Sequence, residues 1–386
     1  MEIVHSRDQL QRFVAAAMAA LPDDGDRVGG SRGTVLVDKY LFGTEVDVDA
    51  VSDGESVVIP GLMEHVERAG VHSGDSMAAY PAAGLDAEVT RQIVSDTVEI
   101  ARALPVRGLC NIQFVIWRGV PHVLEVNPRA SRTVPFISKV TGVPMVELAT
   151  RVMRGEKLRD LGYETGLCPA APLVAVKAPV FSTVKLALVD SALGPEMKST
   201  GEVMGIDISL GAALEKAFVA ALGSVPTKGA VLCSIADSDK AEALPIVAQL
   251  SALGFGVYAT AGTAAALSAA GISATAVGRI GQSRPNVLDI IDEGRVSLIV
   301  NTVSNLETDE LTLSPDGSRG LAAAGRTVKD GYRIRLAAEH RRIACCTSMD
   351  TAQALVDAIT RQRRGGDITV ATVRAYREGI VAAVPG

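Results

Sequence analysis

The chain has 386 residues, of which 48% are hydrophobic and 21% charged, as is typical of a folded globular protein with two or three domains. The net charge is -6 without any long basic run, which argues against a general nucleic-acid surface. No apolar run reaches the ~18–20 residues that a membrane helix needs, which argues against a membrane protein.

The first 39 residues are expected to form two strands, a helix and a loop. Residues 1–4 are expected to form a short strand. Ser6 begins a helix that ends near Ala20, and Gln9, three residues on, completes the pattern of a capping box. Residues 22–33 read as a polar, glycine-rich loop, and the apolar run 34–39 predicts a strand.

A strand with one acidic face is expected at 45–51. Glu45, Asp47 and Asp49 alternate there with apolar residues, so their side chains share one face of the strand. Residues 56–59 continue the same sheet. The apolar spacing in 85–104 predicts a helix.

A hairpin is the clearest local prediction. Two apolar runs at 108–117 and 120–127 flank the dipeptide Arg118-Gly119, which suits a tight turn. A helix is expected at 143–154. The stretch 160–200 mixes proline, glycine and short apolar runs, and reads as irregular strand and loop.

The composition changes near residues 226–229, where a domain boundary is expected. Strands and helices alternate beyond it, which predicts a parallel sheet with helices on both faces, an α/β fold. The expected strands are 230–234, 255–259, 275–277 and 297–301, and the expected helices are 240–253, 263–270 and 286–293.

The five cysteines form no C-x-x-C pair and no zinc-like spacing. The N-terminus lacks the basic and apolar regions of a signal peptide. Reduced cysteines in a cytoplasmic protein are therefore expected.

Three oxygen donors are expected to converge on the hairpin. Glu125 and Asn127 lie two residues apart and share a strand face, and Gln113 can join them from the neighbouring strand. Magnesium prefers such ligands, completed by water and nucleotide phosphates. Arg129 and Arg132 follow directly, and their guanidinium groups suit phosphate oxygens. The alternative is that Glu125 and Asn127 only cap a strand at the surface.

Two further segments suit a nucleotide. The stretch 70–75 (GVHSGD) combines two glycines with His72 and Ser73, and can form a tight loop over phosphates or a sugar. An ordinary polar turn is the alternative. In 39–45 (KYLFGTE), a strand end can hold an adenine edge, while Glu45 accepts ribose hydroxyls.

A third cluster is expected in the second domain. Thr260, Gly262 and Thr263 lie between a strand and a helix, and Asn301 ends another strand. Ligands of open α/β sheets bind at this edge, where a helix N-terminus favours anions. Lys240 and Arg279 add positive charge. Plain helix capping by Thr263 is the alternative.

These segments resemble a known family, the carbamoyl phosphate synthetase large subunit, in its second synthetase unit. The motif EVNPR alone is shared with other ATP-grasp enzymes, but GVHSGD followed by RTVPF is more specific. The matching stretches are 45–50 (EVDVDA), 63–75 (MEHVERAGVHSGD), 107–114 (RGLCNIQF), 125–136 (EVNPRASRTVPF) and 193–205 (LGPEMKSTGEVMG).

The resemblance implies an ATP-dependent ligase that phosphorylates carbamate to carbamoyl phosphate, for arginine and pyrimidine biosynthesis. It implies ATP and Mg²⁺ or Mn²⁺. It assigns the adenine and ribose to Lys39, Leu41 and Glu45, the nucleotide lining to Gly70, Val71, His72 and Ser73, the metal to Gln113, Glu125 and Asn127, and the phosphoryl group to Arg129 and Arg132. Gln113 and Glu125 would also contact ATP.

For the second domain, the resemblance implies a methylglyoxal-synthase-like allosteric fold. A nucleotide effector such as UMP or IMP would lie among Ser234, Lys240, Thr260, Thr263, Asn301 and Thr302. The activator ornithine would meet the acidic side chains Glu67, Asp75 and Glu202.

The expected architecture is α/β and α+β: the C-terminal portion of an ATP-grasp domain at 1–155, a connecting segment at 156–227, and a Rossmann-like, doubly wound parallel-sheet domain at 228–386. In the family, a glycine-rich phosphate loop precedes the position matching Met1. The expected partners are therefore the N-terminal part of the large subunit and the small glutaminase subunit, and little activity is expected of the chain alone.

Two competing functions remain open. The chain could be a non-catalytic nucleotide-sensing fragment that needs a separately encoded N-terminal partner. Another ATP-grasp carboxylate–amine ligase is a further alternative, although the α/β segment 229–386 argues against it.

Overall fold

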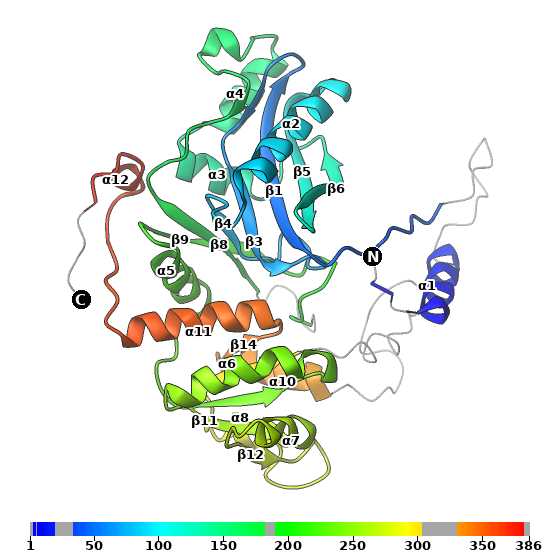
Figure 1. Ribbon diagram of the computed structural model, residues 1–386, viewed down its shortest axis with the longest axis vertical. Coiled ribbons are helices and arrows are strands. Elements are labelled where there is room, and N and C mark those ends of the chain that lie inside the picture. Colours follow the sequence, from blue (N-terminus) through cyan, green and yellow to red (C-terminus); the bar gives the residue numbers. More distant parts are fainter. Residues whose placement is uncertain (1–2, 5, 20–33, 182–189, 303–329, 382–386) are drawn as a thin grey trace.

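The computed structural model describes residues 3–4, 6–19, 34–181, 190–302 and 330–381. Two sheets lie one above the other, with helices α5 (Leu210–Leu222) and α11 (Met349–Arg363) between them (Figure 1). The other helices are α1 (Arg7–Ala19), α2 (Ala87–Ala103), α3 (Val134–Thr141), α4 (Met145–Met153), α6 (Lys240–Ala252), α7 (Ala261–Ala269), α8 (Val287–Asp292), α10 (Asp330–His340) and α12 (Val373–Arg377), with short 3-10 helices at Arg159–Leu161 and Asp237–Asp239.

The first sheet is mostly antiparallel and has the strand order β6-β5-β1-β3-β4-β8-β9. Strand β2 pairs with β1 and with β7. The strands are β1 (Thr44–Asp53), β2 (Val57–Ile59), β3 (Leu62–Arg68), β4 (Ala78–Tyr80), β5 (Arg107–Trp117), β6 (Val120–Asn127), β7 (Gly166–Leu167), β8 (Val174–Val180) and β9 (Gly201–Asp207).

Strand β1 is buried on both faces, and this burial sets up the site. Its apolar side chains, such as Val46 and Val48, pack in one core cluster with Ile93 of α2. Asp47 and Asp49 on the alternate positions are also buried, with at most 1% of their surface exposed. The predicted acidic face is therefore inside the protein, where each carboxylate needs a partner.

The predicted hairpin is confirmed as β5 and β6. Arg118 has φ 54° and Gly119 has φ 76°. Two positive φ angles in a two-residue connection match the twist of the adjoining strands. The register places Gln113 opposite Glu125 and Asn111 opposite Asn127.

The second sheet is parallel, with the order β12-β11-β10-β13-β14, which confirms the predicted α/β fold. Helices α6 and α11 pack in the core cluster on one face, and α8 and α10 pack on the other. The strands are β10 (Ala230–Ser234), β11 (Gly256–Thr260), β12 (Thr275–Val277), β13 (Leu298–Asn301) and β14 (Ala344–Cys346).

One local prediction is wrong, and another is right only in part. Residues 34–39 form no strand; Leu36 is 84% exposed, and no described strand pairs with this segment. The stretch 160–200, expected to be irregular strand and loop, contains the regular strand β8, which joins β4 to β9 within the first sheet. The expected strand at 1–4 lies partly outside the described residues, and its described part, 3–4, is not a strand.

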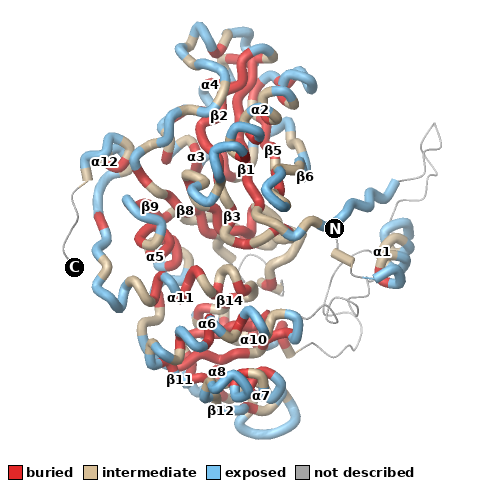
Figure 2. The backbone as a smooth tube through the Cα atoms, viewed as in Figure 1, coloured by how far each residue is buried: buried red, intermediate tan, exposed pale blue. Residues whose placement is uncertain are grey.

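One hydrophobic core runs through both sheets. It includes Met77 and Val176 of the upper half, Phe218 of α5, Leu355 of α11 and Val231 of β10. Figure 2 shows this continuity as buried chain through α5 and α11. The division into 1–155, 156–227 and 228–386 stays a proposal, and within it the middle segment supplies β7, β8, β9 and α5.

Candidate functional site

The predicted oxygen donors lie together on the β5–β6 hairpin. Gln113 and Glu125 are direct cross-strand partners. The amide Nδ2 of Asn127 donates to Oε1 of Glu125 at 2.8 Å, and Nε2 of Gln113 donates to Oγ of Ser73 at 3.0 Å. The glycine-rich loop that precedes β4 therefore reaches the hairpin.

The donor set fits a hard divalent cation. Glu125 supplies an exposed carboxylate, and Gln113 and Asn127 are half-buried amides. Carboxylate and amide oxygens are the ligands that Mg²⁺ and Mn²⁺ prefer. Among the residues that the structure describes, no group of three or more His, Cys, Asp and Glu side chains is placed to hold a metal. The hairpin set differs from such a group because two of its donors are amides.

Asp49 organises the chain that follows the hairpin, and sequence reasoning gave it no role beyond the acidic face. It accepts hydrogen bonds from Asn111 Nδ2 at 3.1 Å, from Ser131 Oγ at 2.6 Å and from Thr133 Oγ1. Burial raises the pKa of Asp49 to about 6, against the opposing effect of these bonds. Asp49 thereby ties residues 131–133, which include Arg132, to β1.

The two predicted arginines differ in how they are held. Arg129 is exposed, and its Nη1 donates to the neighbouring carbonyl of Ala130 at 3.1 Å. Nη1 of Arg132 donates to Oγ of Ser199 at 2.8 Å and lies 3.0 Å from Sδ of Met197. Both contacts of Arg132 come from residues 190–199, here called the arm, which lead into β9.

The GVHSGD loop packs against the arm. The backbone N of His72 donates to the carbonyl of Gly194 at 2.8 Å. Val71 and Ser73 are half-buried, and Nζ of Lys177 donates to the carbonyl of Ser73 at 2.7 Å. Gly70, with φ 113°, donates its N–H to Oε1 of Glu45 at 3.2 Å. The loop is thus held by two buried charged side chains, Lys177 and Glu45.

The expected adenine segment is placed beside the hairpin. Lys39 is exposed, with Nζ 5.3 Å from the ring centre of Trp117, and Leu41 is half-buried. Glu45 is buried, and its Oε2 lies 3.2 Å from Nδ1 of His65. The expected ribose ligand is therefore already paired inside the protein.

His65 lies between two carboxylates of β1. Its Nε2 is 3.1 Å from Oδ2 of Asp47, and its Nδ1 faces Glu45. Burial alone would lower the pKa of His65, but Asp47 and Glu45 outweigh it and raise the pKa to about 9. Lys177 is fully buried nearby, and burial lowers its pKa despite Asp47, Glu202 and Glu67.

The three acids expected at the activator site have different surroundings. Glu67 accepts from Met77 N at 2.8 Å and from Thr351 Oγ1 at 2.6 Å. Asp75 is fully buried and accepts from the backbone of the arm. Glu202 is half-buried, and within the described residues its buried Oε2 has no hydrogen-bond partner.

The residues expected to bind the effector gather at the carboxyl ends of β10, β11 and β13. Thr263 Oγ1 accepts from Ile235 N at 3.2 Å, and Thr302 Oγ1 accepts from Ala236 N at 2.9 Å. Nδ2 of Asn301 donates to the carbonyl of Ser234 at 3.1 Å. Thr260 Oγ1 lies 3.3 Å from Thr263 Oγ1, and Lys240 pairs with Asp237. The cluster thus surrounds the loop that follows β10.

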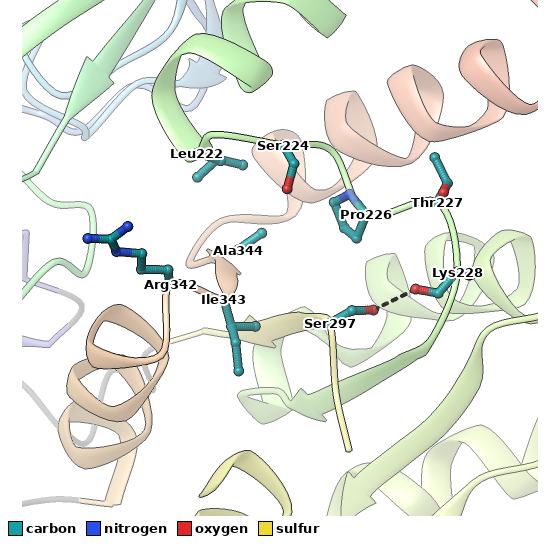
Figure 3. A pocket seen from close by; sticks show the side chains of 9 residues that line it. All are labelled: Leu222, Ser224, Pro226, Thr227, Lys228, Ser297, Arg342, Ile343 and Ala344. Atoms are coloured by element: carbon teal, nitrogen blue, oxygen red, sulfur yellow. Dashed lines mark hydrogen bonds between the residues drawn. The ribbon is translucent and has the colours of Figure 1, made fainter. Parts of the chain in front are cut away.

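A pocket of about 330 Å³ lies at the opposite, amino-terminal edge of the same sheet (Figure 3). Its lining includes Lys228, Ser297 and Arg342, and none of the expected effector residues. Every helix in the described ranges is too short or too polar to cross a membrane.

Comparisons with known proteins match nearly the whole sequence of the chain. The family "Carbamoyl-phosphate synthase L chain, ATP binding domain" matches residues 1–161, and the MGS-like domain family matches residues 242–347. The carbamoyl phosphate synthase large chain of Thermomicrobium roseum is 49% identical over 378 residues, which cover 98% of this chain and 32% of that protein. The chain thus spans about a third of that relative's length.

Two solved structures are more distant. The biotin carboxylase domain of a single-chain bacterial carboxylase is 20% identical, with a TM-score of 0.37, and covers 46% of each chain. The biotin carboxylase domain of a thermophilic 2-oxoglutarate carboxylase is 16% identical, with a TM-score of 0.36, over 48% of this chain and 46% of that chain.

Two family descriptions match successive parts of the chain, and the bacterial relative matches nearly all of it. The chain therefore belongs to the carbamoyl phosphate synthase large-chain family.

Proposed function

We propose that this chain carries the carbamate-phosphorylating site of a carbamoyl phosphate synthase. The observation that supports it most is the meeting of the hairpin, the GVHSGD loop and Arg132. Gln113 contacts Ser73, and Arg132 and His72 both contact the arm. Such a grouping of oxygen donors and guanidinium groups suits phosphoryl transfer, which depends on positioning and charge stabilisation.

In the proposed reaction, a carbamate oxygen attacks the γ-phosphorus of ATP. The bond between that phosphorus and the bridging oxygen of ADP breaks, so carbamoyl phosphate and ADP leave. Arg129 and Arg132 stabilise the charge on the transferred group. The nucleotide is held by Lys39, Leu41, Glu45, Gly70, Val71, His72 and Ser73, together with Gln113 and Glu125.

Gln113, Glu125 and Asn127 would hold a Mg²⁺ or Mn²⁺ ion, whose charge offsets that of the β- and γ-phosphates. Glu125 contributes the formal negative charge of this set. The hydrogen bond from Asn127 keeps its carboxylate oriented on the hairpin.

The wider setting of the reaction is part of the same proposal. The chain works in the cytoplasm with the N-terminal part of the large subunit and a glutaminase subunit, and its product enters arginine and pyrimidine biosynthesis. The family to which the chain belongs supports this setting.

The proposal is tested by the Mg²⁺ dependence of ATP binding. Calorimetric titration of ATP, with and without Mg²⁺, should show that Glu125→Gln weakens Mg²⁺-dependent binding by at least about tenfold. The control is Glu88→Gln, an exposed carboxylate on α2 that pairs only with Arg91 in the described structure. An unchanged Mg²⁺ dependence in Glu125→Gln would contradict the assignment.

For the second domain, we propose binding of a nucleoside monophosphate, UMP or IMP, among Ser234, Lys240, Thr260, Thr263, Asn301 and Thr302. Ornithine would bind near Glu67, Asp75 and Glu202. The convergence of the first set at one sheet edge supports the nucleotide site.

Titration with UMP and IMP tests the nucleotide site. Thr263→Ala should abolish binding, whereas Thr263→Ser keeps the hydroxyl that accepts from Ile235 and should retain it. Binding that survives Thr263→Ala would move the site elsewhere. Titration with ornithine tests the activator site. Glu202→Gln should abolish ornithine binding, and binding that survives this change would move the site elsewhere.

A further inference from the structure

The guanidinium of Arg132 is held by partners that carry no charge. Its Nη1 donates to Oγ of Ser199 at 2.8 Å, lies 3.4 Å from the Ser199 carbonyl and approaches Sδ of Met197 at 3.0 Å. A carboxylate partner would compete with a phosphoryl group for this cation. A hydroxyl fixes its direction and leaves its charge available.

Ser199 can serve as a fixed acceptor because its own donor is already used. Its Oγ donates to the carbonyl of Gly74 at 2.9 Å. The side chain is buried, with 6% exposed, so water does not compete for the remaining lone pair. The hydroxyl therefore presents an acceptor in one direction, towards Arg132.

Asp75 holds this part of the arm in place. Its Oδ1 accepts from the backbone N of Ser199 at 2.9 Å, and its Oδ2 accepts from the backbone N of Lys198 at 2.8 Å. Charge-assisted bonds from a fully buried carboxylate to two successive N–H groups are strong. The two bonds fix the successive peptide groups between Met197 and Ser199, the two arm residues that contact Arg132.

A contrasting arginine shows what a charged partner does. Arg335 is buried and paired in a bidentate manner with Asp190, at the other end of the same arm, with both distances 2.6 Å. Its charge is neutralised by that carboxylate. Arg132 is held by the same arm through a hydroxyl and makes no such bidentate pair, although Glu202 lies near enough to interact with it electrostatically.

We propose that Ser199 is a positioning residue for Arg132, and that Asp75 anchors Ser199 for this purpose. The hydroxyl orients the guanidinium towards the transferred phosphoryl group and does not neutralise the charge of the guanidinium. This inference rests on the proposed role of Arg132 in phosphoryl transfer, and it gives the arm a part in the reaction site.

The test compares affinities for the non-hydrolysable analogue AMP-PNP and for ADP, measured by calorimetry in the presence of Mg²⁺. Only the former carries the γ-phosphoryl group. Ser199→Ala removes the acceptor but keeps the N–H that Asp75 holds, so the arm stays anchored. We expect it to lower the preference for AMP-PNP over ADP by about tenfold, the effect of one lost hydrogen bond to a charged group.

The control is Thr200→Ala, which removes the adjacent hydroxyl; that hydroxyl bonds only to the Val180 carbonyl in the described structure. It should leave the preference unchanged. In an Arg132→Ala background, Ser199→Ala should have no further effect, because the two changes remove one interaction. A structural role for Ser199 would instead weaken both nucleotides alike, in both backgrounds.

The outcomes separate this inference from the proposed function. If Arg132→Ala leaves the AMP-PNP preference intact, the role of Arg132 falls and the inference with it. If Arg132→Ala abolishes the preference and Ser199→Ala does not change it, only the inference is overturned.

Discussion

His65 shows what a buried charge costs and contributes at the level of one residue. It lies between Asp47 and Glu45 with none of its side chain exposed. The two carboxylates keep His65 protonated, and its positive charge stabilises these carboxylates in the interior. Such a group makes stability depend on pH.

The sign of this dependence follows from the raised pKa. The folded pKa of His65 is about 9, against 6.5 when unfolded, so its stabilising effect is complete below pH 6.5 and is lost as the pH rises through 9. At about 1.4 kcal/mol for each tenfold change in proton affinity, the loss is about 3 kcal/mol.

Urea denaturation of the wild type and of His65→Gln between pH 6 and 10 measures this effect. The free energy of unfolding of the wild type should fall towards that of the variant by about 3 kcal/mol over this range. Titrating groups that do not contact His65 affect both proteins alike and cancel in the difference. A difference that stays constant with pH would show that His65 is not protonated in the folded protein.

At the scale of elements, α5 packs in close contact with β9. Gly205 lies where the helix crosses the strand, and a Cβ atom there would meet backbone atoms of Ala213 and Ala217. Backbone cannot move aside as a side chain does. The helix can therefore lie directly on the strand only because this residue is glycine.

We expect Gly205→Ala to lower the free energy of unfolding by about 2–3 kcal/mol, as overpacking does in a close-packed interior. The matched control is Gly201→Ala on the same strand, where nothing lies within 4 Å of the added Cβ. Thermal and urea unfolding of both variants measure the difference. Equal effects at the two positions would show that the helix can shift away from β9.

Local elements could be predicted from the sequence where the signal itself is local. The β5–β6 hairpin depends on two positive-φ residues at its turn, so Gln113 and Glu125 could be placed opposite each other. The stretch 160–200 was expected to be irregular strand and loop, but the bounds of β8 could not be predicted because its centre is buried on both faces and shows no alternation.

The rest of the site depends on contacts that no local pattern contains. Asp49 reaches Ser131 across 82 positions, and Arg132 reaches Ser199 across 67. The acidic alternation of β1 was visible, but its burial was not, because only the fold decides which face is covered. The arm has no periodicity and could not be recognised as part of the site.

On the scale of the whole molecule, polar side-chain contacts join the two halves of the chain beside the hydrophobic core that runs through both sheets. Arg335 of α10 donates to Asp190 in the arm and, at 2.6 Å, to Oδ1 of Asn301 in the expected effector cluster. Thr351 of α11 donates to Glu67 of β3. These bonds join the two sheets at the side where both proposed sites lie.

Replacing Arg335 with methionine should lower the free energy of unfolding by about 2–4 kcal/mol, since it leaves Asp190 and Asn301 without their partner. The single tryptophan, Trp117, reports on the first sheet, whereas far-UV circular dichroism reports on both. The two transitions should still coincide in the variant, because the hydrophobic core that crosses α5 and α11 remains.

Arg333→Met on the same helix is the control, because this arginine is exposed. It should change stability by less than about 0.5 kcal/mol. Separate transitions for the two probes in Arg335→Met would mean that the ion pair, rather than the core, makes the two halves unfold together.

The packing of α11 against α5 also limits how this chain can be recombined with its relatives. A chimera joined near residue 227, with its second half taken from a relative, would set a foreign α11 against Ala213, Ala217 and Phe218 of α5. Here the exchangeable unit must include α5 together with α11, so swapped enzymes should stay soluble only when both helices come from the same parent.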